Sequence, residues 1–188
     1  MKIIFLFLTL FFLNFSTFAD DISDFEIEEV SIGNSLLNFY NKSKINKLKF
    51  FYDQASNKKF AHFDFDSSEN FDKLNVAFKE GDEKFIIKKV TGYIWFDNDI
   101  ENCLKKKNDI VNQIQSIFSE IKVENHDKGT HFKDKNSYTY DSIFRFSGEY
   151  PQNHILVACY DWSKSSGYTD HLRVGIVTSE YAKWLNES

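Results

Sequence analysis

A single amphipathic helix near the middle of the chain limits the folds that this sequence can adopt. From Ile100 to Ile121, apolar residues recur at the i, i+3, i+4 and i+7 spacing that gives a helix one apolar face. Lys105–Lys107 fall on the opposite face, which is expected to be exposed to solvent. Asp97–Asp99 offer caps for the first turn. The spacing predicts a helix over residues 99–120, which must bury its apolar face against another element.

Segments with the apolar pattern of strands lie on both sides of this helix. A short strand at residues 24–32 and a short helical region at residues 36–48 come first. Residues 123–135 are polar and are expected to form a loop, and Ser179 is expected to cap a last short helix. Gly92, inside one strand, is expected to mark a bulge or a bend. Six further strands are predicted at residues 60–66, 74–79, 85–96, 138–147, 155–162 and 172–178.

These elements predict an α+β domain, in which an antiparallel sheet of about six strands carries the long helix on one face. A helix followed by three strands occurs twice in the predicted order, which is consistent with a pseudo-repeat. No linker rich in Pro or Ser divides the chain. Residues 20–188 are therefore expected to form a single domain.

The first nineteen residues have the features of a secretory signal peptide. Lys2 gives a positive start, an apolar run extends from Ile3 to Phe15, and Thr17 and Ala19 place small residues before a cut at Ala19–Asp20. A retained membrane anchor is the alternative, but the run is shorter than the roughly 20 residues needed to span a bilayer. No Cys follows the run, so a lipoprotein is not expected. No integral membrane segment is expected after cleavage.

Composition narrows the class of protein and its compartment. The chain is 42% hydrophobic and 18% aromatic, which excludes a disordered chain. A net charge of −5 argues against nucleic acid as a partner. Lysine greatly outnumbers arginine, with only Arg145 and Arg173 present, as is typical of an AT-rich bacterial genome. A periplasmic or secreted location is therefore expected, and no cofactor is predicted.

Two cysteines remain after the predicted cleavage, Cys103 and Cys159. An even number of cysteines in an exported protein favours a disulfide. Two buried free thiols are the alternative. The chain has no CxxC motif, which argues against a thiol oxidoreductase.

The segment DFEIEEVSIGNSLLNFY, residues 24–40, resembles the opening of small uncharacterised exported proteins from AT-rich marine alphaproteobacteria. Within it, Ile32–Leu36 is similar to the start of the outer-membrane assembly lipoprotein (SmpA/OmlA) family and of the beta-lactamase-inhibitor-like repeat. These resemblances imply a strand that ends in Ile-Gly and leads into a short helix and a strand meander. They imply no catalytic residue.

Two groups of polar residues could bind a metal ion. His62, Asp64 and Asp66 alternate along one predicted strand, and imidazole and carboxylate groups are ordinary metal ligands. The alternative is that these three side chains form the solvent face of the strand. The group His126, Asp127, His131 and Asp134 matches no metal-ligand spacing and is assigned to a solvated loop.

Two aromatic pairs are candidates for ligand binding. Tyr93 and Trp95, like Tyr160 and Trp162, are two positions apart on a predicted strand, so each pair shares a strand face. On adjacent strands they could line a surface for a sugar or a peptide, because Tyr and Trp combine apolar area with a polar group. The alternative is that all four rings belong to the core.

The chain contains no motif that identifies a reaction, such as GxSxG, SxxK or HExxH. The favoured hypothesis is an exported, non-catalytic module that binds an envelope protein or a small ligand. An envelope enzyme, possibly metal-dependent through His62, Asp64 and Asp66, is the alternative. An inhibitor-like factor of the cell envelope is a third class.

Overall fold

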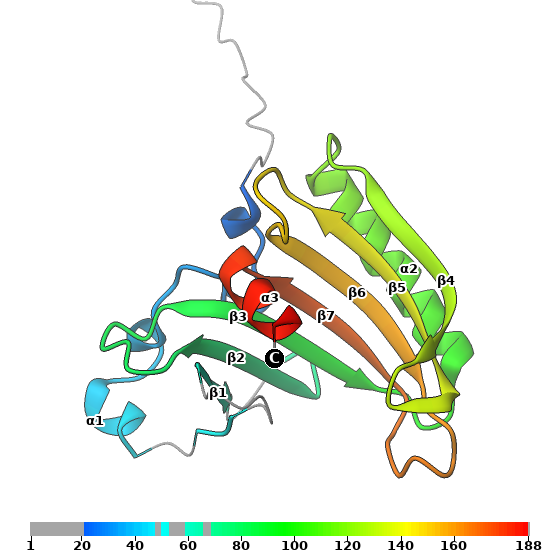
Figure 1. Cartoon of the computed structure of the whole chain (residues 1–188), viewed down its shortest axis with the longest axis horizontal. Helices are drawn as coiled ribbons and strands as arrows, with labels where there is room; N and C mark the ends of the chain where they lie inside the picture. Colours follow the sequence, from blue (N-terminus) through cyan, green and yellow to red (C-terminus); the bar gives the residue numbers. More distant parts are fainter. Residues whose placement is uncertain (1–20, 48–49, 53–58, 66–68, 188) are drawn as a thin grey trace, which may run out of the picture.

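The computed structural model describes residues 21–47, 50–52, 59–65 and 69–187, so the predicted signal peptide and its cleavage site lie outside the described residues. Within this part of the chain, one antiparallel sheet has the strand order β1-β2-β3-β7-β6-β5-β4 (Figure 1). No helix there is long and apolar enough to cross a membrane. The strands are β1 (Phe60–Asp64), β2 (Lys73–Lys79), β3 (Ile87–Trp95), β4 (Val123–His131), β5 (Asp134–Arg145), β6 (His154–Asp161) and β7 (His171–Val177), and the α-helices are α1 (Lys42–Ile45), α2 (Ile100–Ile117) and α3 (Ser179–Asn186).

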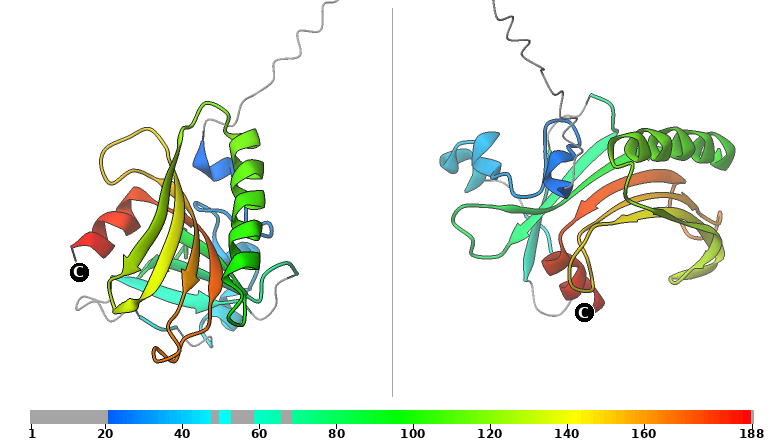
Figure 2. Two further views of the ribbon diagram at one scale, coloured as in Figure 1. Left: turned by 90° about the vertical axis from the view of Figure 1, so that its right-hand side faces the viewer. Right: turned by 90° about the horizontal axis from the view of Figure 1, so that it is seen from above.

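The sheet is strongly curved and carries its two longer helices on opposite faces. Figure 2 shows α2 lying along the convex face, where it packs on β6 and β7, as the apolar stripe of α2 predicts. The shorter helix α3 lies on the concave side, at the end formed by β1, β2 and β3. The predicted α+β class is therefore confirmed.

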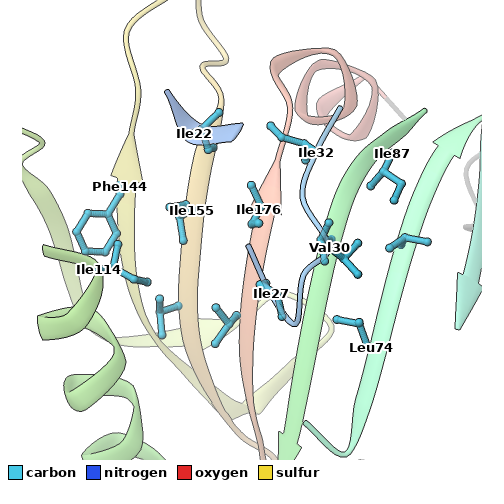
Figure 3. Close-up of a cluster of buried hydrophobic side chains, with 14 of the residues drawn as sticks. Ile22, Ile27, Val30, Ile32, Leu74, Ile87, Ile114, Phe144, Ile155 and Ile176 are labelled. Carbon is cyan, nitrogen blue, oxygen red and sulfur yellow. The ribbon is translucent and has the colours of Figure 1, made fainter. Parts of the chain in front are cut away.

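The main hydrophobic core lies under the convex face. Alternate residues of the central strands point into it, as Val90 in β3, Ile155 in β6 and Ile176 in β7 illustrate. The N-terminal segment covers the part that α2 does not reach, and Figure 3 shows its Ile22 and Val30 among the strand residues. Helix α2 and the irregular N-terminal segment together cover the convex face of the sheet.

A second, smaller cluster lies on the concave face under α3. Trp184 and Tyr181 of α3 pack on Phe60 of β1, with ring centroids about 5 Å apart. Thr178 caps α3 by accepting a hydrogen bond from the N–H of Tyr181, one position before the expected cap. Because α3 fills only this end, no helix among the described residues covers the rest of the concave face (Figure 2).

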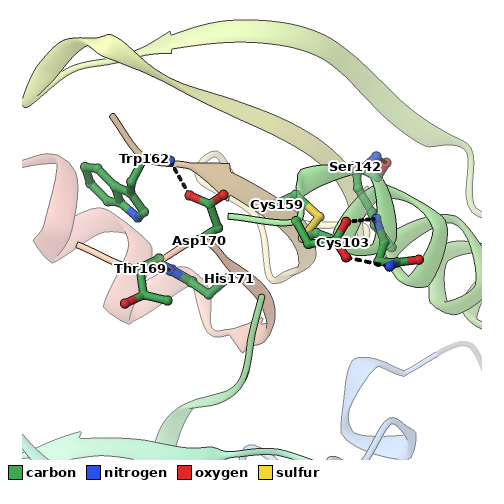
Figure 4. The surroundings of a disulfide bond; sticks show 10 residues. Cys103, Ser142, Cys159, Trp162, Thr169, Asp170 and His171 are labelled. Carbon is green, nitrogen blue, oxygen red and sulfur yellow. Dashed lines mark hydrogen bonds between the residues drawn. A yellow bond between two sulfur atoms is a disulfide. The ribbon is translucent and has the colours of Figure 1, made fainter. Parts of the chain in front are cut away.

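A disulfide bond joins α2 to the sheet. Cys103, in the first turns of α2, bonds to Cys159 in β6, and both residues are fully buried (Figure 4). The predicted disulfide is confirmed, and the alternative of two free thiols is wrong. The bond fixes the N-terminal half of α2 over the centre of the sheet.

The sheet has seven strands, one more than expected. Residues 123–135, predicted to be a loop, form the whole of β4, the turn after it and the first two residues of β5. Most residues of β4 are polar and exposed, so the segment has no apolar alternation from which a strand could be recognised. With four strands after α2, the expected repeat of a helix and three strands does not match.

The N-terminal prediction was also wrong in part. Residues 24–32 form no strand: a 3-10 helix covers Ile22–Asp24, and an isolated bridge joins Ile27 to Val30 around a tight turn. Their apolar residues are buried in the core as predicted for a strand, which explains the error. The short helical region, capped by Ser35, is confirmed as a 3-10 turn followed by α1.

Gly92 has a different role from the one expected. The irregular pairing of β3 lies at Ala77 and Phe78 of β2, not at Gly92. A Cβ atom on Gly92 would come within 2.4 Å of the ring of Phe71. Glycine is required here because an aromatic ring packs directly on the strand backbone.

Candidate functional site

The four aromatic residues predicted as a binding surface lie together on the concave face. Tyr93 and Trp95 are on β3, and Tyr160 and Trp162 are on and just after β6. The two strands are not adjacent as expected, because β7 lies between them. The strand register places Tyr93 opposite Arg173, and both Trp95 and Tyr160 opposite His171. We call these six residues the concave aromatic patch: Tyr93, Trp95, Tyr160, Trp162, His171 and Arg173.

The rings of the patch stand side by side in two nearly parallel rows. Tyr93 and Trp95 are stacked with centroids 5.8 Å apart and planes 20° apart. Tyr160 and Trp162 are stacked in the same way, at 6.1 Å and 15°. Since each row follows one strand, the parallel rings reflect the alternation of side chains across the sheet.

His171 connects the two rows. Its ring stacks on Tyr160 at 4.6 Å and 15° and lies 5.4 Å from the ring of Trp95, nearly perpendicular to it. All six residues of the patch keep part of their surface exposed, and Trp95 is the most exposed at 43%. The alternative that these rings belong to the core is therefore wrong, because the core lies on the opposite face.

Two neighbouring loops extend the patch. The ring centroid of His131, at the end of β4, lies 4.4 Å from that of Trp162, and the ring centroid of Tyr168 lies 4.6 Å from that of Trp162. Tyr168 is 63% exposed, and Phe132, beside His131, is 85% exposed. Large apolar groups left in water beside an aromatic surface are typical of binding sites.

An open pocket of about 720 Å³ lies at the end of the patch. Its walls are Trp95, His171 and the loop Gly167–Thr169, and Asp72 and Asp97 contribute carboxylates. The volume is within the range of roughly 300–1,000 Å³ that is usual for small-ligand sites. The pocket thus combines ring surfaces with hydrogen-bond acceptors.

Hydrogen bonds accepted by two carboxylates hold the loop beside the pocket in shape. Asp170 is buried and accepts a hydrogen bond from the N–H of Trp162 at 2.7 Å, drawn as a dashed line in Figure 4. Burial raises the pKa of the Asp170 carboxyl. Asp134 accepts hydrogen bonds from the hydroxyls of Ser137 and Ser163, which lower its pKa. These two carboxyls anchor both ends of the connection that carries Tyr168.

Three histidines of this face, His131, His154 and His171, are held neutral at pH 7. Burial lowers the pKa of His131, His154 and His171. Nδ1 of His171 lies 2.9 Å from the carbonyl oxygen of Thr169, and Nδ1 of His154 lies 3.1 Å from that of Gln152. Since a carbonyl can only accept, both Nδ1 atoms carry the proton. The Nε2 atoms of His154 and His171 are therefore acceptors.

Only two of the three predicted metal ligands, His62 and Asp64, lie among the described residues. Each contacts a different partner. His62 is 1% exposed, covered by α3, and its Nε2 atom lies 3.3 Å from the Tyr181 hydroxyl. Asp64 pairs with Lys73 at 2.8 Å, and Asp66 lies outside the described residues. Among the residues described, no group of three or more His, Cys, Asp or Glu is placed to hold a metal ion. The alternative that His62 faces solvent is wrong, because α3 covers His62. The last helix was predicted, but its packing on β1 was not.

A buried polar chain lies on the other face of the sheet. Lys107, expected on the wet side of α2, is only 7% exposed and donates a hydrogen bond to the Ser142 hydroxyl at 2.8 Å. Ser142 in turn donates to Asn125 at 2.6 Å. Because Ser142 is fully buried, it cannot reach a substrate, and we assign this chain to the packing of α2 on β5.

Sequence reasoning missed His171 and Arg173. Both lie in a strand whose alternate residues Leu172 and Val174 are apolar, so the alternation already placed them on the opposite face. The alternation did not indicate that β7 lies between β3 and β6. That order depends on long-range pairing.

Comparison of the chain with protein-family models, with characterised proteins and with solved structures finds no match.

Proposed function

We propose that this protein is an exported binding module that holds a saccharide on its concave aromatic patch. The observation that carries the proposal is the position of His171, which joins the Tyr93–Trp95 and Tyr160–Trp162 rows into one surface beside a pocket. Aromatic rings with polar groups at their edges suit a ligand that is apolar on one face and polar around its rim. A sugar ring has this character, with C–H groups on its faces and hydroxyls around its circumference.

The place of the patch in the sheet favours a saccharide over a peptide. An extended peptide is commonly recognised through the free backbone groups of a sheet edge. The patch lies on β3, β7 and β6, each of which is hydrogen-bonded on both sides. Recognition there must use side chains, and the Nε2 atom of His171 together with Asp72 and Asp97 provides acceptors for hydroxyls.

Export is part of the same proposal. The N-terminal apolar run, the expected cut at Ala19–Asp20 and the absence of a lipidation Cys support a periplasmic or secreted protein. The disulfide Cys103–Cys159 is compatible with an oxidising compartment. In a bacterial envelope, saccharides are available as free oligomers and as parts of the cell surface.

The proposal is tested by titrating the protein with neutral and acidic oligosaccharides and following tryptophan fluorescence. Two of the three tryptophans, Trp95 and Trp162, lie in the patch, so a bound sugar should change the signal. We expect Trp95→Ala to weaken binding about 5- to 150-fold, since stacking on an aromatic side chain contributes on the order of 1–3 kcal/mol.

Tyr150→Ala is the matched control. Tyr150 is 77% exposed but lies in the turn between β5 and β6, at the end of these strands remote from Trp162. Its loss should leave affinity unchanged. If no oligosaccharide binds the wild-type protein, or if both variants weaken binding equally, the saccharide proposal is wrong.

A further inference from the structure

Arg173 lies in the middle of the concave aromatic patch without a carboxylate partner. Its guanidinium is 5.8 Å from the centre of the Tyr93 ring and 3.5 Å from the Tyr160 hydroxyl. No described Asp or Glu forms a salt bridge with it. The only other arginine of the chain, Arg145, pairs with Glu124 at 2.9 Å.

The carboxylates of the concave face lie away from Arg173. Among the described residues of β3, β7 and β6, no Asp or Glu shares a strand face with Arg173. Four described carboxylates on this side of the sheet have cationic or histidine partners: Asp64 with Lys73, Asp141 with His126, Glu124 with Arg145, and Glu180 with Lys79 and Lys88. Asp72 and Asp97 line the pocket at the end of the patch, and neither forms a salt bridge with Arg173.

A partly buried guanidinium surrounded by aromatic rings loses hydration that the rings do not fully replace. Cation–π contact with Tyr93 offsets part of this cost. A bound anion would offset more, because charge-assisted hydrogen bonds to an oxyanion are the strongest that a guanidinium makes. His154 and His171 stand nearby as neutral rings and bring no negative charge of their own.

We propose that Arg173 is the anion subsite of the concave aromatic patch, and that the saccharide bound there is acidic. This inference rests on the proposed function and names its ligand class. The planar fork of Arg173 would hold two oxygens of a carboxylate or phosphate group carried by the sugar. The aromatic rows contact the sugar ring, and the acceptors of the pocket bind its hydroxyls.

The anion subsite is tested by NMR on the Nε–Hε groups of the two arginines. Arg145→Lys removes one signal and so assigns both. In the wild-type protein, titration with sodium acetate or with inorganic phosphate should shift the Arg173 signal saturably, while sodium chloride at equal ionic strength should not. Whichever of acetate and phosphate binds more tightly indicates whether the acidic group of the sugar is a carboxylate or a phosphate. Equal, non-saturating shifts of both arginine signals would overturn the proposal.

The ligand class is tested by calorimetry with a matched pair of sugars, trigalacturonic acid and neutral galactotriose. We expect the acid to bind the wild-type protein at least tenfold more tightly. Arg173→Gln should remove this preference and Arg173→Lys should keep part of it, whereas Arg145→Gln should leave it intact. Equal affinity for both sugars in the wild type overturns the inference and leaves the saccharide proposal standing.

The reverse outcome is also distinguishable. If acetate or phosphate saturates Arg173 but neither sugar binds, the anion subsite is supported and the saccharide proposal is wrong. The wild-type measurements decide both questions even if Arg173→Gln does not fold.

Discussion

Tyr160 of β6 and His171 of β7 stack face to face across neighbouring strands, with ring centroids 4.6 Å apart and planes 15° apart. The pair joins two rows of rings that are far apart in the sequence, and it borders both the pocket and Arg173. Because Nδ1 of His171 is bound to the Thr169 carbonyl, the loop before β7 fixes the orientation of the ring. The position of this one histidine determines whether the patch is a continuous surface.

The stability of the protein should fall as the pH drops below about 6.5. The pKa values of His131, His154 and His171 lie below their ordinary value of 6.5 in the folded protein, mainly because of burial. Between 6.5 and the folded pKa, the unfolded chain binds protons that the folded protein does not, so stability is lost over this interval. Urea unfolding at pH 7.5 and pH 5.0 measures the loss. His171→Phe should make it smaller, and an equal loss in this variant would contradict the explanation.

The disulfide should contribute much of the stability. Cys103 and Cys159 are 56 positions apart, and closing a loop of this size stabilises a protein by about 4 kcal/mol in the chain-entropy model. We expect the double variant Cys103→Ala, Cys159→Ala to lower the free energy of unfolding by about this amount. Wild-type protein unfolded with reductant should show a similar loss. A decrease below about 1 kcal/mol would mean that α2 is held by its apolar contacts alone.

Substitutions at the two ends of the buried Lys107–Ser142 hydrogen bond should have unequal effects on stability. Ser142→Ala leaves the Lys107 ammonium buried without its hydroxyl partner, so it should destabilise the protein by about 1–3 kcal/mol. Lys107→Met replaces the charge with an apolar chain of similar length and should be nearly neutral or stabilising. Adding Lys107→Met to Ser142→Ala should therefore recover stability in thermal unfolding. Lys105→Met, at an exposed position of α2, is the control and should recover nothing.

Two glycines of the central strands should respond differently to alanine. Gly92→Ala drives a Cβ atom into the ring of Phe71 and should destabilise the protein by about 1–3 kcal/mol. At Gly175 the nearest atom to an added Cβ is Thr91 Oγ1 at 3.5 Å, an ordinary contact. Gly175→Ala should therefore be neutral or stabilise by up to about 1 kcal/mol. Denaturant midpoints compare the two, and recovery of Gly92→Ala by Phe71→Leu would identify the clash as the cause.

Local pattern was sufficient to predict the elements with strong periodicity. The apolar stripe of α2, the alternation in β3 and β6 and the even number of cysteines are all properties of short segments or of composition. They yielded the fold class, the long helix, the disulfide and the shared faces of the two aromatic pairs. Strand β4 was missed because most of its residues, on both faces, are exposed, and its existence depends on pairing with β5.

The candidate site was predictable only as two separate halves. Alternation placed Tyr93 with Trp95 and Tyr160 with Trp162, but the order of the strands brought His171 and Arg173 between them. The burial of His62 under α3 has the same origin, since α3 reaches β1 from the other end of the chain. Contacts between distant segments decide both cases, and no local pattern encodes them.

The indole N–H signals of the three tryptophans test the binding surface most directly. Trp95 and Trp162 lie in the concave aromatic patch, whereas Trp184 is 1% exposed in the cluster under α3. In a titration of the isotope-labelled wild-type protein with trigalacturonic acid and galactotriose, we predict that the Trp95 and Trp162 signals shift saturably and that the Trp184 signal stays in place. Sugar titrations that move none of the three signals, or that move Trp184 as much as the other two, would contradict a saccharide site on this face.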